Sequence, residues 1–326
     1  MPGPNRRDLF VMTTLAAAAG TLGAGSANAQ TADPAGAREG VPGVFRYRVG
    51  SFEVMPVYDG IRSFPLSPSF VTNAPVEDVR SAFSDAMRPE DLIENPFTPT
   101  LVRTEDRLIL IDTGNGPQEG ESPVGRLVEH MGQVGIPPEE VDLVVISHFH
   151  PDHISGLKTA DGEPMFPNAE VLVPEREMAF WLDEGEESRA AEGRKPNFAL
   201  VRRIFGDEVL SVRTYADGDE IVPGMVAVAA YGHSPGHMAF RIESEGERLL
   251  LLSDAAHLPF LFVRNPDWAL MFDMDPEMAR ESRRRLLDQA ADEGMLVAGY
   301  HWGFPNVGHV RRAGDGYELI RMPWPS

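Results

Sequence analysis

The sequence predicts an α/β sandwich. Short apolar and β-branched runs alternate with stretches of helical character through both halves of the chain. Two pairs of such runs are separated by only a short turn, as in β-hairpins. No segment repeats with a period of about 20 to 50 residues, which argues against a solenoid or a propeller. A mixed fold is therefore favoured over an all-β or an all-α fold.

The expected elements follow from hydrophobic periodicity and turn residues, in chain order. Hairpins are expected to pair 45–49 with 52–60 and 100–104 with 107–114. Residues 141–147 (VDLVVIS) form a continuous apolar run, which is typical of a strand buried on both faces. Further strands are expected at 169–173, 209–214, 224–230, 237–243, 247–253, 295–299 and 317–321. Helices are expected at 75–87, 122–133, 137–141, 175–204 and 275–293.

Residues 1–29 resemble a bacterial twin-arginine (Tat) export signal. Arg6 and Arg7 precede a weakly apolar, alanine-rich stretch, and Ala27 and Ala29 form an Ala-x-Ala cleavage pattern. This predicts export to the periplasm or the medium, with cleavage after Ala29. The apolar run is shorter than the roughly 20 residues of a membrane span, so we expect no stable membrane anchoring. Residues 30–43 are expected to be a flexible linker, and residues 44–326 one folded domain.

The composition restricts the chemistry. The 326 residues include 50 Asp and Glu against 29 Lys and Arg, a net charge of -21, and no cysteine. Without cysteine there are no disulfides, no thiolate nucleophile and no cysteine-bound metal. The acidic balance argues against a nucleic-acid partner, because it repels phosphates. Any metal site must therefore use nitrogen and oxygen ligands.

Seven of the nine histidines fall in four short segments, and each segment follows a predicted strand. Residues 147–153 read SHFHPDH, which places His148, His150, Asp152 and His153 in one tight loop. Imidazole and carboxylate are the preferred ligands of zinc-like ions when thiolate is absent. Residues i and i+2 of such a loop can share one ion while i+4 and i+5 approach a second. This segment predicts a site for one or two metal ions.

The other three segments are weaker signals when taken singly. They are GHSPGH with His233 and His237, LLLLSDAAH with Asp254 and His257, and AGYHWGF with His301. A histidine in a Gly/Pro turn is often a surface residue, and an aspartate after a strand is often a helix N-cap. Their order and spacing together indicate one metal centre. His130 is expected to lie on a surface helix without a functional role.

Over residues 44–321 the sequence resembles the metallo-β-lactamase-fold hydrolases. The resemblance is carried by four features in this order: the string H-x-H-x-D-H, the string GHSPGH, an Asp at the end of a strand and a late His. The resemblance implies a four-layer αββα sandwich with two divalent metal ions, most commonly zinc, with manganese, cobalt and iron as alternatives. His237 is usually not a ligand in that family. The resemblance implies a first ion held by His148, His150 and His233, a second held by Asp152, His153 and His301, and Asp254 bridging the two.

The same resemblance implies roles for residues around the ions. Hydroxide shared by the two ions would be the nucleophile, since metal ions lower the pKa of water from 15.7 towards roughly 7. Asp152 or Asp254 would relay a proton. Asp112 matches the family's buried acid beneath the metal loop, where it orients a ligand. His257 is expected either to support a ligand or to contact substrate. An apolar substrate pocket, with core packing as the alternative, is expected from Trp181, Phe198, Leu258 and Phe260.

Within that family the sequence is more similar to methyl parathion hydrolase and dihydrocoumarin-type lactonases. The matching strings are YDG at 58–60, FWL at 180–182, SDAAH at 253–257 and HWGFPNVGHVRR at 301–312. The implied substrates are small lactones, aryl esters and organophosphate triesters, and the implied assembly is a homodimer. A β-lactamase, or another esterase or thioesterase of this fold, is an alternative. An exported metal-binding protein without turnover is the alternative from another functional class.

Overall fold

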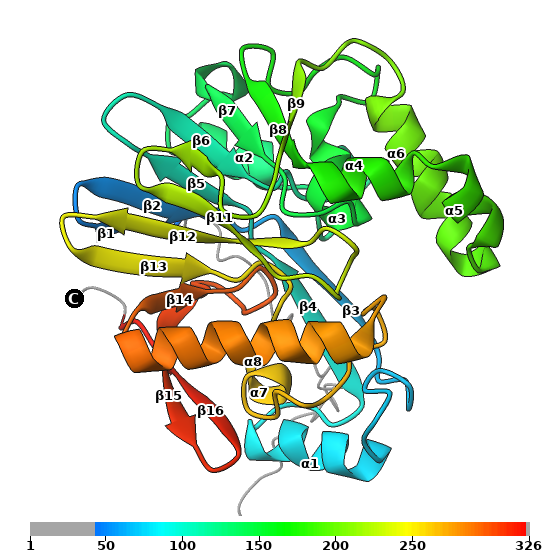
Figure 1. Ribbon diagram of the computed structural model, residues 1–326, viewed down its shortest axis with the longest axis vertical. Coiled ribbons are helices and arrows are strands. Elements are labelled where there is room, and N and C mark those ends of the chain that lie inside the picture. The colour runs from blue at the N-terminus through cyan, green and yellow to red at the C-terminus, as the bar shows by residue number, and fades with distance from the viewer. Residues whose placement is uncertain (1–42, 324–326) are drawn as a thin grey trace, which may run out of the picture. The chain divides into compact units, whose positions relative to one another are not determined.

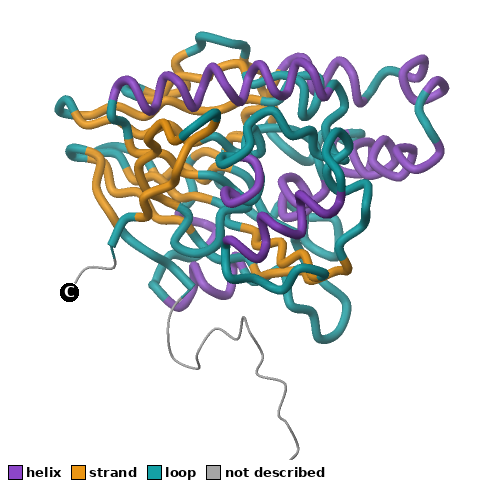
Figure 2. Tube along the Cα trace, turned by 90° about the horizontal axis from the view of Figure 1, so that it is seen from below, coloured by secondary structure: helices purple, strands orange, loops and turns teal. Residues whose placement is uncertain are grey.

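The computed structural model describes residues 43–323. The predicted export signal and all but Gly43 of the predicted linker lie outside the described residues. Two seven-stranded sheets face each other, and helices cover their outer faces (Figure 1). In the view of Figure 2 the strands gather on one side and long loops on the other. The four-layer αββα sandwich predicted from the sequence is confirmed.

The first sheet has the order β1-β2-β5-β6-β7-β8-β9. Strands β6 to β9 run parallel, so their carboxyl ends lie at the same edge of the sheet. The apolar run predicted as a buried strand forms β7, whose three residues are all buried. The strands are β1 (Tyr47–Val49), β2 (Phe52–Pro56), β5 (Thr100–Arg103), β6 (Leu108–Ile111), β7 (Leu143–Val145), β8 (Glu170–Pro174) and β9 (Val212–Tyr215).

The second sheet contains β10 to β16 in chain order. Its only parallel pair among the described residues is β13 with β14, so the chain leaves both strands at the same edge. Strands β10 and β15 were not expected from the sequence. The strands are β10 (Glu220–Val222), β11 (Met225–Ala229), β12 (Met238–Ser244), β13 (Glu247–Leu251), β14 (Leu296–Ala298), β15 (Val307–Ala313) and β16 (Gly316–Arg321).

A separate two-stranded ribbon, also not expected, pairs β3 (Gly60–Pro65) with β4 (Leu92–Phe97). The α-helices are α1 (Val76–Asp85), α2 (Leu127–Gln133), α3 (Pro151–Ile154), α4 (Glu175–Trp181), α5 (Glu184–Arg189), α6 (Lys195–Phe205), α7 (Pro259–Phe262) and α8 (Pro276–Glu293). Short 3-10 turns form at Pro138–Glu140, Ser155–Leu157 and Glu192–Arg194. Within residues 43–323, no helix has both the length and the apolar character needed to cross a bilayer.

Three cores separate the layers. Apolar side chains of both sheets meet between them, among them Val145 of β7 and Phe240 of β12. Helices α2, α4 and α6 pack on the outer face of the first sheet. Helix α8 packs on the second sheet through Leu286 and Leu287. The loops at the strand ends therefore rest on a rigid, doubly covered base.

Some expected helices differ from the structure. The helix expected at 122–133 begins only at Leu127, because Val124 bridges to Gly60 and Gly125 has a positive φ of 85°. The 137–141 segment is a single 3-10 turn, whereas the helices expected within 175–204 are present as α4, α5 and α6. His130 is buried rather than on the surface, and its Nδ1 lies 2.5 Å from the carbonyl oxygen of Tyr58.

Candidate metal centre

Four loops bring the predicted ligands together at one edge of the two sheets. The chain leaves β7 into residues 147–153, leaves β13 at Asp254, and leaves β14 at His301. Residues 232–237 connect β11 to β12. The donor atoms form two groups, each with all its atoms within 4.8 Å of one another. One group contains His148, His150, His233 and Asp254, and the other contains Asp152, His153 and His301.

The first group has the spacing of a coordination shell. Nδ1 of His150 lies 3.0 Å from Nε2 of His148 and 3.0 Å from Nε2 of His233. Oδ2 of Asp254 lies 3.3 Å from the same His233 nitrogen. Ligands about 2.0 to 2.1 Å from a zinc ion lie roughly 3.3 Å apart at tetrahedral angles. These four side chains can therefore surround one ion with small adjustments.

The second group adjoins the first through Asp254. Oδ2 of Asp152 lies 3.6 Å from Nε2 of His153 and 3.5 Å from Nε2 of His301. Oδ1 of Asp254 lies 3.4 Å from the His153 nitrogen, and its Oδ2 lies 3.1 Å from the His301 nitrogen. The Asp254 carboxylate thus lies between the two groups, the place that the sequence resemblance assigned to it.

Two unpaired buried atoms show that the residues fit bound cations. Nε2 of His153 and Oδ1 of Asp254 are buried, and no described residue forms a hydrogen bond with either. Buried polar atoms are nearly always paired, because leaving them unpaired costs free energy. A divalent ion between them would satisfy both. All donors are nitrogen or carboxylate oxygen, which suits zinc and similar ions.

The electrostatics of the group also favour cations. Burial lowers the pKa of His148 and of His150 well below the ordinary value, so both imidazoles are neutral, as metal binding requires. Burial opposes ionisation of Asp254, but His301 and His153 outweigh it and hold the pKa of Asp254 well below the ordinary value. The ionised carboxylate therefore lies beside the two neutral imidazoles of His148 and His150. Burial is outweighed by neighbouring carboxylates at His153 and His233 and the pKa of both is raised, the latter to about 9, so a metal ion would have to displace a proton from each of these two rings.

Asp112 is hydrogen-bonded to His153 of the second group. Its Oδ2 lies 2.8 Å from Nδ1 of His153, and its Oδ1 accepts the backbone N–H of Ser147 at 2.7 Å. The carboxylate fixes the His153 proton on Nδ1, which leaves Nε2 free for a metal ion. Asp112 has a positive φ of 60°, an uncommon conformation for a non-glycine residue. Its placement fits the orienting role expected from the sequence.

His237 lies in the motif but has no free nitrogen. Its Nδ1 lies 2.9 Å from the carbonyl oxygen of Ala230, and its Nε2 accepts the backbone N–H of Asp254 at 3.1 Å. Burial lowers the pKa of His237 to about 3, so the ring remains neutral. His237 therefore positions the segment that carries Asp254.

Glu177, which the sequence analysis did not identify, joins two of the ligand-bearing loops. Its side chain is fully buried at the start of α4. One carboxylate oxygen accepts the N–H of Phe149 at 2.9 Å, and the other accepts the hydroxyl of Ser234 at 2.7 Å and the N–H of Gly236. In the sequence Glu177 resembles an ordinary acid in the first turn of a helix, so no local signal marks it.

Trp181 does not line an open pocket but packs in the core, the alternative that the sequence left open. Its side chain has no exposed surface, and its Nε1 donates to Glu177 at 2.8 Å. It therefore supports the same loops as Glu177. Phe198 is also buried and packs on Trp181 with 4.7 Å between ring centroids. Phe198 borders a cavity of about 430 Å³ that reaches Gly232 and Ser234, on either side of His233.

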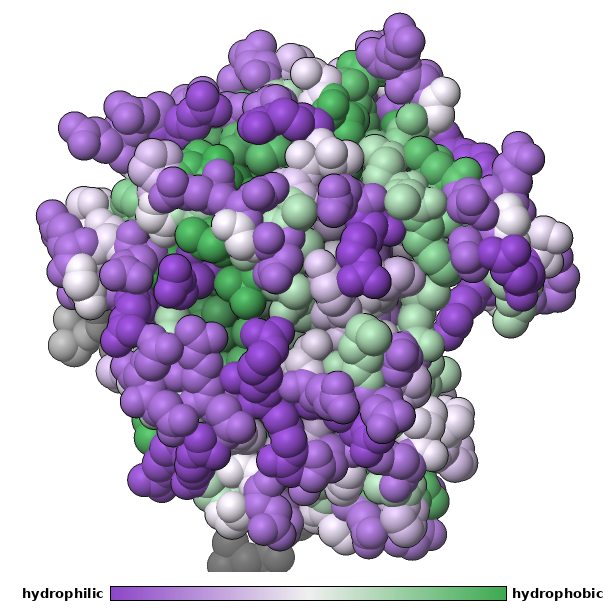
Figure 3. Space-filling model, in the orientation of Figure 1, coloured by the Kyte–Doolittle hydropathy of each residue, from purple (hydrophilic) through white to green (hydrophobic). Residues whose placement is uncertain are grey.

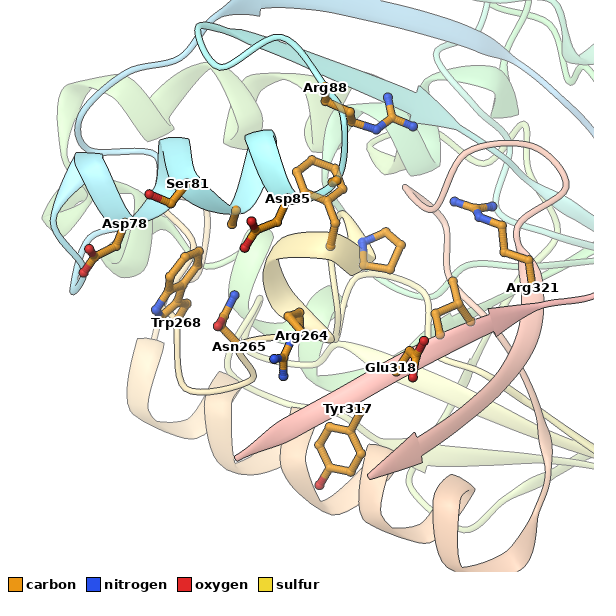
Figure 4. A pocket seen from close by; sticks show the side chains of 15 residues that line it. Asp78, Ser81, Asp85, Arg88, Arg264, Asn265, Trp268, Tyr317, Glu318 and Arg321 are labelled. Atoms are coloured by element: carbon orange, nitrogen blue, oxygen red, sulfur yellow. The ribbon is translucent and has the colours of Figure 1, made fainter. Parts of the chain in front are cut away.

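Leu258 and Phe260 lie in other surroundings than the predicted pocket. Leu258 is buried in an apolar cluster with Phe70 and Phe262. Phe260 borders a separate cavity of about 670 Å³ between α1, α7 and β16 (Figure 4). None of the residues lining the cavity that Phe260 borders is a predicted metal ligand.

His257 and the partly exposed ligands define where a substrate can approach. The His257 ring lies 4.1 Å from that of His301, and its buried Nδ1 has no partner among the described residues. Among the seven predicted ligands only His150 and Asp152 are partly exposed, the Asp152 side chain by 21%. Access is therefore from their side. Most of the face shown in Figure 3 is hydrophilic, in keeping with the net charge of -21.

Comparison with known sequences gives consistent matches. Residues 98–301 match the family described as Metallo-beta-lactamase superfamily. An N-acyl homoserine lactonase of Bacillus thuringiensis is 27% identical over 237 residues, which cover 67% of this chain and 85% of the relative. An N-acyl homoserine lactonase of Bacillus cereus is 28% identical over 237 residues, with 67% and 86% covered.

Solved structures are similar over most of the chain. The dizinc quorum-quenching lactonase AidC superposes with a TM-score of 0.80 at 24% identity, covering 87% of this chain and 99% of AidC. The hydrolase AbOPH, of the beta lactamase superfamily, gives 0.79 at 26% identity, with 88% and 99% covered. The matched family region contains all seven predicted ligands and ends at the last of them, His301. The chain thus belongs to the metallo-beta-lactamase superfamily and is a metal-dependent hydrolase.

Proposed function

We propose that this protein is a dinuclear-metal hydrolase that opens lactone rings and cleaves aryl esters. The observation that carries this proposal is the Asp254 carboxylate, whose oxygens lie 3.4 Å from His153 and 3.3 Å from His233, one ligand of each group. Asp254 would therefore contribute to both groups of ligands, and two ions held in this way would supply two-metal hydrolysis. The lactonases that match over 85% of their own length support the choice of lactones.

When bound, the two ions would polarise the carbonyl oxygen of the substrate and activate a water molecule. The protein's part is to hold the ligands and to move protons. Asp152 is the more exposed of the two carboxylates, so it is placed to take a proton from the attacking water and pass it to the leaving oxygen. His237 holds the backbone of Asp254 while this happens.

The surroundings of His257 suit a substrate with an apolar part. Phe70 meets the His257 ring edge-on at 6.1 Å between centroids. Phe272, which is 40% exposed, packs edge-on against Phe70 at 6.3 Å and lies 6.5 Å from the His257 ring. The unpartnered Nδ1 of His257 is placed to contact a polar atom of the substrate near these rings. An acyl chain or an aromatic ring beside a lactone fits this combination.

Hydrolysis of organophosphate triesters is a second candidate. The strings FWL, SDAAH and HWGFPNVGHVRR resemble methyl parathion hydrolase, and they include Asp254, His257 and His301. A two-ion centre can serve a tetrahedral phosphoryl group as well as a planar ester.

The test is one comparison of kcat/KM with residues 30–326 loaded with zinc or manganese. The substrates are dihydrocoumarin, N-hexanoyl-homoserine lactone and methyl paraoxon. We expect one or both lactones to exceed the phosphotriester by several orders of magnitude. A faster phosphotriester would favour the second candidate. If none is turned over while the metal stays bound, β-lactams are tested next, and a metal-binding role without catalysis follows if these also fail.

We also propose that the protein is exported through the twin-arginine pathway. Arg6 and Arg7, followed by the alanine-rich stretch and Ala27-x-Ala29, support this. The test is fractionation of cells producing the full chain beside the variant in which both arginines are lysine. Periplasmic protein beginning at Gln30, lost in the variant, is the expected result. Protein that remains in the cytoplasm with its first residues intact would contradict it.

A further inference from the structure

A buried ion pair lies directly behind the ligand His233. Oδ1 of Asp273 lies 2.9 Å from Nδ1 of His233, and its Oδ2 lies 3.4 Å from Nη2 of Arg283 on α8. The side chains of Asp273 and Arg283 have no exposed surface. Charges are rarely buried in this way, because their lost hydration must be replaced by pairing and hydrogen bonds. The pair is therefore unusual for the interior of a protein.

Arg283 uses its remaining donors on three backbone carbonyl oxygens. Its Nε donates to the carbonyl oxygen of Ala255 at 2.7 Å. Its Nη1 donates to the carbonyl oxygens of Pro266, at 3.0 Å, and of Trp268. Ala255 directly follows the bridging Asp254. One guanidinium thus connects the segment after Asp254 with the carboxylate that contacts His233.

The neighbouring arginines on α8 do not make such contacts. Arg285 is exposed, and its Nη2 donates to the carbonyl oxygen of Ala229. Arg284 is partly exposed and pairs with Asp267. Arg283 instead points inward, with its guanidinium 5.1 Å from the ring centroid of Phe262. Its burial is therefore specific to this position and not a property of the basic stretch 283–285.

We infer that Asp273 and Arg283 are positioning residues of the metal centre. Asp273 holds His233 with its proton on Nδ1, so that Nε2 faces the first ion. Arg283 binds both the Asp273 carboxylate and the Ala255 carbonyl oxygen, and it thereby keeps His233 and Asp254 in fixed relative positions. This inference rests on the dinuclear centre of the proposed function, but not on the identity of the substrate.

The experiment measures zinc binding, not activity. The variants are Asp273→Asn, Arg283→Met and the double variant, with Arg285→Met as the matched control on the same helix. For each, the zinc content per chain is determined, zinc affinity is measured by competition with a chelator, and thermal unfolding is followed without metal. Outer partners of metal-binding histidines typically contribute about 10- to 100-fold to metal affinity.

We expect Asp273→Asn to weaken binding of one of the two zinc ions by about 10- to 100-fold, while Arg285→Met binds both like the wild type. Each single variant leaves one buried charge unpaired and should unfold at a lower temperature without metal. The double variant removes both charges, so its metal-free stability should recover while its zinc affinity stays weakened.

Two results would overturn the inference. One is wild-type affinity for both ions in Asp273→Asn. The other is a double variant whose zinc affinity recovers together with its stability, since the pair would then serve folding alone. Wild-type protein that binds two ions but hydrolyses no ester would refute the proposed substrates and leave this inference standing. Wild-type protein that binds no second ion would refute both.

Discussion

Nε2 of His153 and Oδ1 of Asp254 lie 3.4 Å apart, and neither atom has a hydrogen-bond partner among the described residues. Both atoms are buried, so the arrangement would be costly without a cation. Asp254 also reaches His301 and His233 through its other oxygen. The centre is therefore organised around one carboxylate.

Replacing Asp254 with alanine should remove the link between the two groups. We expect Asp254→Ala to retain at most one zinc ion per chain and to lose at least about 100-fold in kcat/KM on lactones, because the two-ion chemistry is lost. Metal analysis and kinetics on the same preparation measure both. Asp292→Asn, a change at an exposed carboxylate, is the control. Two bound ions with near-full activity would refute the bridging role.

Removing the metal should destabilise the fold. The ligands His153 and Asp254 are buried, and each has a side-chain atom without a hydrogen-bond partner among the described residues. Zinc at 100 times its Kd should raise the free energy of unfolding by about 2.7 kcal/mol per ion. Thermal unfolding with a chelator, and again after zinc is restored, measures this. Magnesium, which prefers oxygen ligands, should give little shift. Identical melting curves with and without zinc would argue against occupied sites.

Glu177 should be required for the arrangement of the loops. Both its oxygens accept hydrogen bonds, from Phe149 and Trp181 on one side and from Ser234 and Gly236 on the other. In Glu177→Gln an amide NH2 group replaces one of the two carboxylate oxygens. It then faces a hydrogen-bond donor from which that oxygen had accepted. Leaving a buried donor unpaired costs about 1 to 3 kcal/mol, which denaturant unfolding detects. Glu186→Gln, at a surface ion pair, should change stability by less than about 1 kcal/mol. Equal effects would mean that Glu177 is no more important than a surface acid.

His257 should matter for turnover but not for metal content. Its Nδ1 is unpartnered and its ring lies against that of His301. We expect His257→Phe to bind two zinc ions and to lose about 10- to 100-fold in kcat/KM, the size of one lost hydrogen bond in a transition state. Loss of a zinc ion in this variant would show instead that His257 supports a ligand. Unchanged kinetics would exclude both roles.

The sequence predicted the ligands because each follows an apolar strand in a short, unusual string. Continuous apolar runs such as residues 141–147 indicated the strands reliably, and strand ends in a sandwich of this kind converge. The predicted His148, His153 and Asp254 accordingly meet in the structure. The local sequence pattern was therefore sufficient to predict a ligand wherever a histidine or aspartate closely follows the end of an apolar strand.

Features that depend on contacts between distant residues were missed. Asp273 lies 40 residues after His233, and Glu177 lies 57 residues before Ser234, so no spacing relates them. Strand β15 contains Gly308, Arg311 and Arg312 and lacks the apolar alternation of a typical strand. A pocket position was expected for Trp181, with core packing as the alternative. The sequence alone cannot distinguish an aromatic side chain in the core from one that lines the mouth of a substrate pocket.

The central claim is that two ions act together on a lactone. The measurement that tests it most directly is a zinc titration of the metal-free chain, with lactone hydrolysis followed at each step. The account predicts little activity with the first equivalent, a steep rise with the second and a plateau at two per chain. A plateau at one equivalent, or full binding without hydrolysis of any lactone, would contradict it.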